Sequence, residues 1–171
     1  RRDDMMGANG LLGGWATLVC GAALTAEFRV KVEIGITWAG DGAANQGAVL
    51  ESRSLAAVGD LPVIVVIENN GYAEATSRSY ATAVDSYVDR AAGFGLPGVT
   101  VDGTDLFAVH EPAGELIRRA RQGGRPSLPG WQTARVYGHL EGDPQTYRGP
   151  PELAYNRPQP ACPPLLDRES G

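Results

Sequence analysis

The chain contains few cysteines and has no excess of positive charge. Two of its 171 residues are cysteines, Cys20 and Cys162, and they provide neither a disulfide framework nor the spacing of a metal-ligand cluster. The formal net charge is −5 and no basic stripe is visible, which argues against nucleic acid as the main partner.

The sequence also lacks a persuasive membrane segment. Its longest uncharged run, residues 7–26, has about the length of a membrane span, but it is rich in Gly and Ala and contains the polar Asn9 near its start. We interpret this run as a helix buried on most sides, with Cys20 in the core. No signal peptide is expected ahead of it, so we predict a cytoplasmic protein without a membrane partner.

Length and composition fit one globular domain with a substantial core. Hydrophobic residues make up 43% of the chain and charged residues 20%. We predict that this domain spans residues 1–148. Six prolines follow Arg148, too densely for a packed helix or strand, so residues 149–171 are expected to form a Pro-rich, disordered tail.

The hydrophobic pattern alternates between strand-like and helix-like segments. We expect helices over Trp15–Phe28 and Asn45–Val58, the second ended by Gly59 as its C′ residue, and a third helix capped by Thr104 or Asp105, with Leu106, Val109, Ala113, Leu116, Ile117 and Ala120 at helical spacing. Strands are expected over Val30–Trp38, Leu61–Ile67 and Val99–Val101. This alternation predicts an α/β fold, a parallel sheet flanked by helices, with ligands at the carboxyl ends of the strands.

Three local features conflict with this pattern. Arg53 lies on the apolar face of its helix, where a guanidinium needs a partner or a route to solvent. Pro112 is expected to interrupt the third helix at a cost of about 3 kcal/mol. Pro129 and Gly130 fall where a strand is expected, although a central strand does not easily carry proline.

The strongest signal for chemistry is the pair of motifs Gly40-Asp41-Gly42 and Asn69-Asn70, each of which follows a predicted strand. The glycines allow a phosphate to approach the backbone, and the helix that follows offers free N–H groups. An aspartate beside a diphosphate requires a cation between the two anions, so Asp41 and Asn70 predict a Mg²⁺ site. A Walker loop is excluded because no Lys-Ser or Lys-Thr follows the glycines, and the Rossmann G-x-G-x-x-G pattern is broken at Asn45.

These motifs resemble those of the alpha subunit of two-chain, thiamine-diphosphate-dependent 2-oxo acid dehydrogenases, the pyruvate and acetoin dehydrogenase group. The segments GANGLLGG, GDGAANQG, ENNGY, DRAAGFGLPGVTVDG and GHLEGDPQTYR match in order and spacing, from Gly7 to about Arg148. The last segment is most similar to acetoin dehydrogenases. The resemblance implies a thiamine-diphosphate-binding fold, present here in part.

The resemblance also implies roles for single residues. Asp41, the Asn70 side chain and the Tyr72 carbonyl would bind Mg²⁺. The main chain of Gly42 and Ala43 would bind the diphosphate, and that of Gly10 and Leu12 the aminopyrimidine ring. Arg135 corresponds to a basic residue near the site, and His139 to a loop histidine near the reacting centre. The resemblance thus indicates nine candidate site residues in all: Gly10, Leu12, Asp41, Gly42, Ala43, Asn70, Tyr72, Arg135 and His139.

His139 is the only one of these that we assign a catalytic role. Taken alone, a histidine in a Gly-rich loop is more often simply solvated, and the motif position is what favours function. His110 lies within a helical pattern and is expected to be structural or exposed. Glu68, which precedes the asparagines, is not assigned to catalysis because packing at the strand end explains it equally well.

The family resemblance implies an oxidoreductase that decarboxylates a pyruvate-like 2-oxo acid, or cleaves acetoin, and passes the acyl group to the lipoyl arm of an acyltransferase component. The cofactor carries the organic chemistry. The glutamate that activates the cofactor would come from a beta subunit, so a hetero-oligomer is expected and the chain alone is expected to be inactive. A segment that precedes GANG in the family, with a Tyr-Arg pair on the diphosphate, is absent here. Leu140 stands where some relatives have a phosphorylatable serine.

Three alternatives remain open on the sequence. The first is a non-catalytic fragment or decayed subunit that keeps the fold, which the local conflicts would explain. The second is another thiamine-diphosphate class with both halves of the site in one chain. The third is a general nucleotide-binding module.

Overall fold

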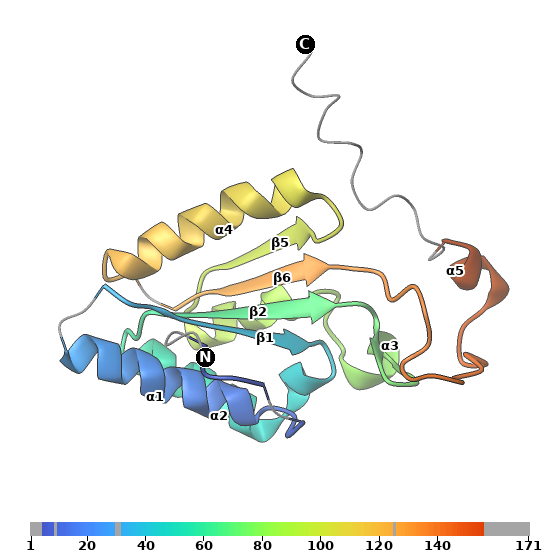
Figure 1. Ribbon diagram of the computed structural model, residues 1–171, viewed down its shortest axis with the longest axis horizontal. Helices are drawn as coiled ribbons and strands as arrows, with labels where there is room; N and C mark the ends of the chain where they lie inside the picture. The colour runs from blue at the N-terminus through green and yellow to red at the C-terminus, as the bar shows by residue number, and fades with distance from the viewer. Residues whose placement is uncertain (1–4, 9, 30–31, 125, 156–171) are drawn as a thin grey trace, which may run out of the picture.

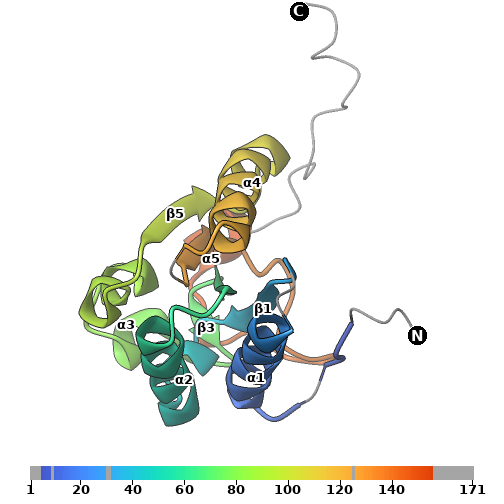
Figure 2. The same ribbon diagram turned by 90° about the vertical axis from the view of Figure 1, so that its left-hand side faces the viewer.

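Four parallel strands form the centre of the molecule. The computed structural model describes residues 5–8, 10–29, 32–124 and 126–155. In the sheet, the strand order is β1 (Gly35–Gly40), β2 (Val63–Asn69), β6 (Leu128–Gln132) and β5 (Gly98–Asp102) (Figure 1). Helices α1 (Gly14–Phe28) and α2 (Gly47–Val58) cover one face, and α4 (Leu106–Arg121) covers the other (Figure 2). The predicted α/β fold with a parallel sheet flanked by helices is confirmed.

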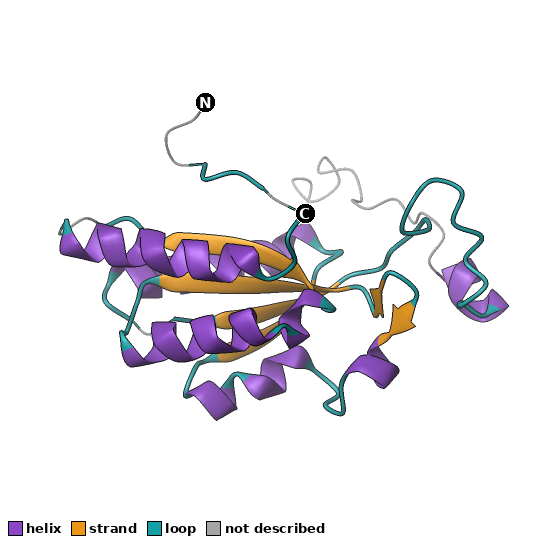
Figure 3. Cartoon of the chain, turned by 90° about the horizontal axis from the view of Figure 1, so that it is seen from below, coloured by secondary structure: helices purple, strands orange, loops and turns teal. Residues whose placement is uncertain are grey.

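The shorter elements surround one end of this sheet or one of its faces. They are η1 (Ala43–Asn45), β3 (Tyr72–Ala73), β4 (Thr76–Ser77), α3 (Arg78–Ala81), η2 (Tyr87–Arg90), η3 (Ala92–Phe94) and α5 (Pro150–Tyr155). The antiparallel hairpin β3–β4, α3 and α5 lie beyond the carboxyl ends of the strands (Figure 3). This is the edge where a parallel α/β sheet binds its ligands.

The apolar residues of β2 supply both layers of the core, because successive side chains of a strand point to opposite faces. Val63, Val65 and Ile67 belong to the cluster on the side of α1 and α2. Ile64 and Val66 pack with Leu116 and Ala120 of α4 on the other side. A strand buried on both faces reads as a continuous apolar run, as predicted.

Helix α1 packs so closely on β1 that Gly35 has no room for a side chain. A Cβ atom there would lie 2.6 Å from Val19 Cγ2 and 3.1 Å from the Val19 carbonyl oxygen. Gly35→Ala is therefore expected to push α1 outward and to lower the free energy of unfolding by about 1–3 kcal/mol. Urea denaturation measures this.

The matched control for Gly35→Ala is Gly21→Ala, on the exposed face of the same helix, where a Cβ would meet nothing within 4 Å. Alanine in an exposed helical position is expected to stabilise by roughly 0.5–1 kcal/mol relative to glycine. The two Gly→Ala changes should thus have opposite signs. An unchanged or higher denaturation midpoint for Gly35→Ala would contradict the close packing of α1 on β1.

Several predicted boundaries were wrong: β1 ends at Gly40 rather than Trp38, β2 spans Val63–Asn69 rather than Leu61–Ile67, and α2 begins at Gly47 rather than Asn45. Val30 and Lys31 lie outside the described residues, and β1 starts only at Gly35, because its pairing partner β2 begins at Val63, after Pro62. In the second helix, Gly59 is the C-cap with φ −84°, and the left-handed residue is Asp60 with φ +48°. The chain also makes a separate 3-10 turn over Ala43–Asn45 before α2 begins.

The prolines are accommodated where the sequence predicted conflict. Pro112 lies inside α4, which continues through it, so the expected interruption was wrong. Pro129 lies in β6 between β2 and β5, and the β2–β6 ladder is interrupted there: Ile64 bridges Ser127, and regular pairing resumes at Ile67 with Gly130. The pairing of β6 with β5 continues past Pro129 and maintains the strand.

The third helix has its predicted cap but a narrower core face. The Asp105 carboxylate accepts hydrogen bonds from the N–H groups of Phe107 and Ala108 at 2.8 and 3.3 Å, as a helix cap does. Leu116 and Ala120 are buried as predicted, whereas Leu106 is exposed because it lies at the carboxyl edge of the sheet, beyond the packed part of the face.

Helix α1 is less covered than predicted. Ala16, Val19, Cys20, Ala23 and Ala26 are buried against the sheet and α2. The opposite face carries Leu18 and Phe28, which are 54% and 82% exposed. No described helix is long and apolar enough to cross a membrane.

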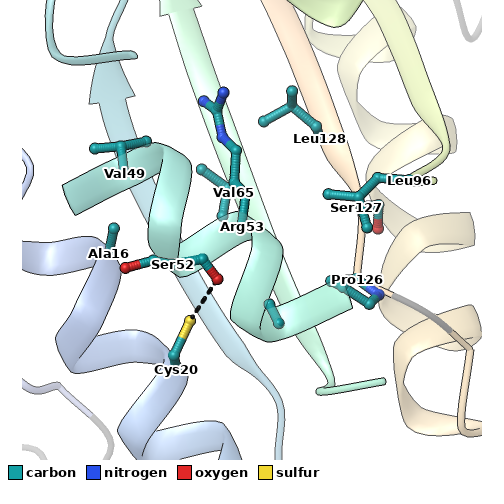
Figure 4. Close-up of a pocket in the computed structure, with 11 residues that line it drawn as sticks. Ala16, Cys20, Val49, Ser52, Arg53, Val65, Leu96, Pro126, Ser127 and Leu128 are labelled. Carbon is teal, nitrogen blue, oxygen red and sulfur yellow. Dashed lines mark hydrogen bonds between the residues drawn. The ribbon is translucent and has the colours of Figure 1, made fainter. Parts of the chain in front are cut away.

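Arg53 is buried without the expected partner. Its side chain extends past Val65 between Val49 and Leu128 (Figure 4), and it is 2% exposed. Within the described part of the chain, none of its three guanidinium nitrogens has a hydrogen-bond partner. Burial, and secondarily the charge of Arg90, lowers the pKa of Arg53 to about 10. The neighbouring Cys20 thiol donates to the Ser52 carbonyl at 3.5 Å and is a core residue, as predicted.

The start of the predicted tail is helical. Residues 156–171, including Cys162, lie outside the described part, but Pro150–Tyr155 form α5. The two prolines occupy the first positions of this helix, where the missing N–H group has no intrahelical partner anyway. The expectation that these prolines exclude a helix was wrong at this point.

Candidate functional site

The two motifs meet at the carboxyl edge of the sheet. β1 and β2 are parallel, and Gly40 pairs with Glu68. The Asp41 N–H donates to the Glu68 carbonyl at 3.2 Å, so the segments that follow β1 and β2 leave the sheet side by side. The structure confirms that Asp41 and Asn70 follow neighbouring parallel strands.

Asp41 is a buried carboxylate without enough compensating charge. It is 2% exposed, and its Oδ1 accepts a hydrogen bond from the Gly42 N–H at 3.1 Å. Burial raises the pKa of Asp41, although the N–H groups of Gly42 and Gly71 and the charge of Arg135 oppose this shift. A cation at this carboxylate would remove the penalty of burial.

The two asparagines have different tasks. Asn69 is buried; its carboxamide accepts from the Gly71 N–H at 3.2 Å and donates to Gln132 at 3.0 Å, which ties the ends of β2 and β6 together. Asn70 is half-buried, and its Oδ1 accepts from the Tyr72 N–H at 3.1 Å in an Asx turn. The loop that carries Asn70 lies close to Asp41, because the N–H group of the next residue, Gly71, lowers the pKa of the Asp41 carboxyl.

Gly42 is the contact point between the two loops. A Cβ on Gly42 would lie 2.3 Å from the Ala73 Cβ, so the hairpin β3–β4 packs directly on the Gly-Asp-Gly turn. Ala43 and Ala44 are also buried, at 6% and 0% exposure. Glycine and alanine have no polar side chain, so only main-chain groups of Gly42 and Ala43 could serve a ligand here, and that role stays a prediction.

Arg135 joins this hairpin to the loop that carries His139. Its Nη2 donates to the Glu74 carbonyl and to the Tyr147 hydroxyl, each at 2.7 Å. Its guanidinium lies over the rings of Tyr72 and Tyr147, 5.6 and 5.7 Å from their centroids. Arg135 thus lies against Tyr72 and the turn of the β3–β4 hairpin, and its role towards a ligand stays a prediction.

Tyr72 is held from both sides. Arg148 lies 5.1 Å from the centroid of its ring, and its hydroxyl donates to Glu152 of α5 at 2.7 Å. The bond to Glu152 raises the pKa of Tyr72. With ring and hydroxyl held, the Tyr72 main chain keeps a defined position in the turn after Asn70.

The remaining predicted residues, His139, Gly10 and Leu12, are exposed. His139 is exposed, and its N–H donates to Asp143 at 2.8 Å. Gly10 and Leu12 are exposed, and the adjoining Gly13 lies against Gln46, whose Cβ would be 3.1 Å from a Cβ at position 13. Glu68 and His110 are exposed, the latter as expected.

The donor set suits a hard cation held by few side chains. Among the described residues, no three His, Cys, Asp or Glu side chains gather in one place. A metal here would need the mixture predicted from the sequence: one carboxylate, one carboxamide oxygen and a carbonyl oxygen, with ligand phosphates completing the shell.

Sequence reasoning missed four residues that organise the site: Asn69, Asp143, Tyr147 and Arg148. Asp143 precedes a proline, which is a turn signal, but nothing in its spacing indicates that Tyr147 contacts it. The segment GHLEGDPQTYR contains Asp143, Tyr147 and Arg148, but its spacing does not indicate their hydrogen bonds. The bond that links this segment to Arg135 forms only in the folded chain.

The chain matches the model of the family described as "Dehydrogenase E1 component" over residues 1–166. It belongs to this family. Among the curated E1 proteins, it is 68% identical over 164 residues to the alpha subunit of acetoin:2,6-dichlorophenolindophenol oxidoreductase of Cupriavidus necator, a match that covers 96% of this chain and 49% of that protein. The corresponding Bacillus subtilis subunit is 56% identical over 144 residues, covering 84% of this chain and 43% of that protein.

Pyruvate dehydrogenase E1 alpha subunits are more distant. That of Rhizobium meliloti is 41% identical over 147 residues, 86% of this chain and 42% of that protein. The chain therefore spans about half the length of these relatives. A Mycobacterium smegmatis structure, described as a candidate thiamin diphosphate-dependent enzyme, has a TM-score of 0.57 at 23% identity, covering 74% of this chain and 23% of that one. This likeness supports the fold.

Proposed function

We propose that this chain is the cofactor-binding part of an E1 alpha subunit and binds Mg²⁺–thiamine diphosphate. The observation that carries the proposal is the buried Asp41 carboxylate at the end of β1, next to the Asn69-Asn70-Gly71 turn. Such a carboxylate is costly to bury unless a cation joins it.

Each predicted residue then has one role. Asp41, the Asn70 side chain and the Tyr72 carbonyl would hold Mg²⁺, and the main chain of Gly42 and Ala43 would meet the diphosphate. Gly10 and Leu12 would line the aminopyrimidine ring, whereas Arg135 and His139 would lie towards the reacting end. When bound, thiamine diphosphate supplies a carbanion and an electron sink. The protein residues bind, orient and protect it from water.

For the complete protein, we propose an oxidoreductase that acts on acetoin or on a pyruvate-like 2-oxo acid and passes the acyl group to a lipoyl acyltransferase. The 68% identity to a protein named for acetoin and the lower 41% identity to one named for pyruvate favour acetoin. His139 would act as the catalytic side chain near the substrate, because it is exposed on a loop that Arg135 ties to the site.

We also propose a beta subunit as partner. The relatives are named as alpha subunits, and the chain displays uncharged apolar side chains that a partner could cover. Leu11 and Leu12 are 72% and 66% exposed beside the site, and Leu18 and Phe28 continue along α1. Isolated exposed leucines are ordinary, but several exposed apolar side chains on α1 and on the segment directly before it favour an interface.

A chimera tests this function. Residues 5–148 would replace the matching segment of the Cupriavidus necator alpha subunit, co-expressed with its beta subunit, and reduction of dichlorophenolindophenol would be followed with acetoin and with pyruvate. We expect turnover, faster with acetoin, and none when the chimera carries Asp41→Asn. A chimera that assembles with the beta subunit but turns over neither substrate would overturn the proposal and favour a non-catalytic subunit.

A further inference from the structure

The loop of residues 137–148, here called the His139 loop, is built around the carboxylate of Asp143. One oxygen accepts from the His139 N–H at 2.8 Å and the Tyr147 hydroxyl at 2.6 Å, and the other accepts from the Gln145 N–H at 2.9 Å. These bonds, the one from Tyr147 foremost, lower the pKa of Asp143 to about 2. The Asp143 side chain thus bonds to residues near both ends of the loop, His139 and Tyr147.

The backbone of the His139 loop contains an unfavourable conformation that contacts with other residues must stabilise. Gln145 is a non-glycine residue in the left-handed region, with φ +54°, a conformation that surrounding contacts must enforce. A Cβ on Gly138 would lie 2.6 Å from the Asp143 Cβ. The residue before His139 therefore packs directly on Asp143, while the His139 side chain remains exposed.

Tyr147 connects this loop to the candidate cofactor site. Its hydroxyl donates to Asp143 and accepts from Arg135 Nη2 at 2.7 Å, and the same nitrogen donates to the Glu74 carbonyl of the β3–β4 turn. A continuous series of hydrogen bonds runs from the hairpin that carries Tyr72 to the main chain of His139. The ring of Tyr147 also lies 5.4 Å from that of Tyr72.

We propose that Asp143 and Tyr147 are positioning residues for His139: they fix its backbone relative to the hairpin that carries Tyr72. The catalytic part of this inference rests on the proposed function, because it takes His139 as the side chain near the reacting centre. A misplacement of such a group by about 1 Å lowers turnover roughly 100-fold, so a loop free to move would leave the cofactor bound but the enzyme slow.

A purely local role predicts a different result. If Asp143 only stabilised its own turn, loss of the Tyr147 hydroxyl would leave the His139 amide protected and turnover unchanged. The two variants Tyr147→Phe and Asp143→Asn each remove part of the hydrogen-bond series and retain the size of the side chain. Tyr80→Phe and Asp85→Asn are matched controls on exposed residues whose side chains are not part of this hydrogen-bond series.

The first measurement needs no activity. Hydrogen exchange of the His139 amide in the 171-residue chain is expected to accelerate by roughly 10-fold or more in Tyr147→Phe and Asp143→Asn, which is the effect of losing one well-placed hydrogen bond. Amides in β2 should exchange at unchanged rates. Unchanged protection of His139 in both variants would overturn the inference.

The second measurement uses the active chimera. We expect kcat to fall about 10- to 100-fold in both variants, with KM for acetoin and the affinity for Mg²⁺–thiamine diphosphate within twofold of the parent. An equal loss of cofactor affinity, or an unchanged kcat, would show that these residues do not act through His139. If the parent chimera binds no cofactor, the proposed function fails and the catalytic role with it, whereas hydrogen exchange still decides whether the loop is held as described.

Discussion

Asp41→Asn is expected to abolish Mg²⁺-dependent binding of thiamine diphosphate. The substitution keeps the shape of the side chain but removes the only carboxylate of the predicted metal ligands. Loss of a direct ligand should cost more than the roughly 10- to 100-fold typical of residues that merely support a ligand. Calorimetry of the full chimera with thiamine diphosphate, with and without Mg²⁺, measures this, and Asp85→Asn is the exposed control.

The same substitution should stabilise the protein when no ligand is present. Burial raises the pKa of Asp41 in the folded state, so the folded protein retains this proton at pH values where the unfolded chain has lost it. The folding free energy therefore becomes less favourable as the pH rises through the unfolded pKa of about 3.9 towards the raised folded value.

We thus expect Asp41→Asn to raise the melting temperature of the ligand-free protein at pH 7 but not near pH 3. Opposite signs for stability and binding separate this effect from misfolding, which would lower both. Retained Mg²⁺-dependent binding in Asp41→Asn would remove Asp41 from the metal site, and a lower melting temperature at pH 7 would show that its carboxylate has a partner in the ligand-free fold.

Arg53→Met is expected to raise the stability of the fold by about 2 kcal/mol, because it removes a buried charge that has no partner among the described residues. Methionine follows the same unbranched path between Val49 and Leu128 and fills part of the space. For a domain of this size the change corresponds to a rise in melting temperature of roughly 4–8 °C. Thermal denaturation of the 171-residue chain measures it.

The pH dependence provides the control for Arg53. Burial and the charge of Arg90 lower the pKa of Arg53 to about 10. The buried guanidinium therefore becomes partly neutral as the pH approaches this value, and the free-energy cost of burying its charge falls. The advantage of Arg53→Met should accordingly narrow between pH 7 and pH 10, whereas the exposed Arg121→Met should have little effect at either pH. A drop in melting temperature at pH 7 would mean that the guanidinium is stabilised by a group bound in solution.

Much of the fold follows from local pattern. The continuous apolar run of β2 indicates a strand covered on both faces, and Asp105 caps α4 as its position predicts. The Gly-Asp-Gly and Asn-Asn motifs follow the neighbouring parallel strands β1 and β2 at the carboxyl edge of the sheet, as their spacing predicts. These predictions succeed because side-chain period, caps and turns are set by neighbours within a few residues.

The errors lie where distant residues decide. β1 begins at Gly35 because β2 begins at Val63, and β6 tolerates Pro129 because its pairing with β5 continues where its pairing with β2 is interrupted. Pro150 and Pro151 start a helix whose Glu152 bonds to Tyr72. The start of β1 and the tolerance of Pro129 thus depend on strands far along the chain, whereas Pro150 and Pro151 are tolerated because they begin a helix.

The amino-acid sequence by itself determined the α/β class, the order of most elements and the pair of motifs at the carboxyl edge of β1 and β2, because these depend on spacing along the chain. Only the tertiary structure decided that Asp41 is buried with too little compensating charge, that Arg53 has no hydrogen-bond partner among the described residues and that Asp143 bonds to both His139 and Tyr147. Burial and hydrogen bonds between distant residues exist only once the chain has folded, and they set the cost of each charge.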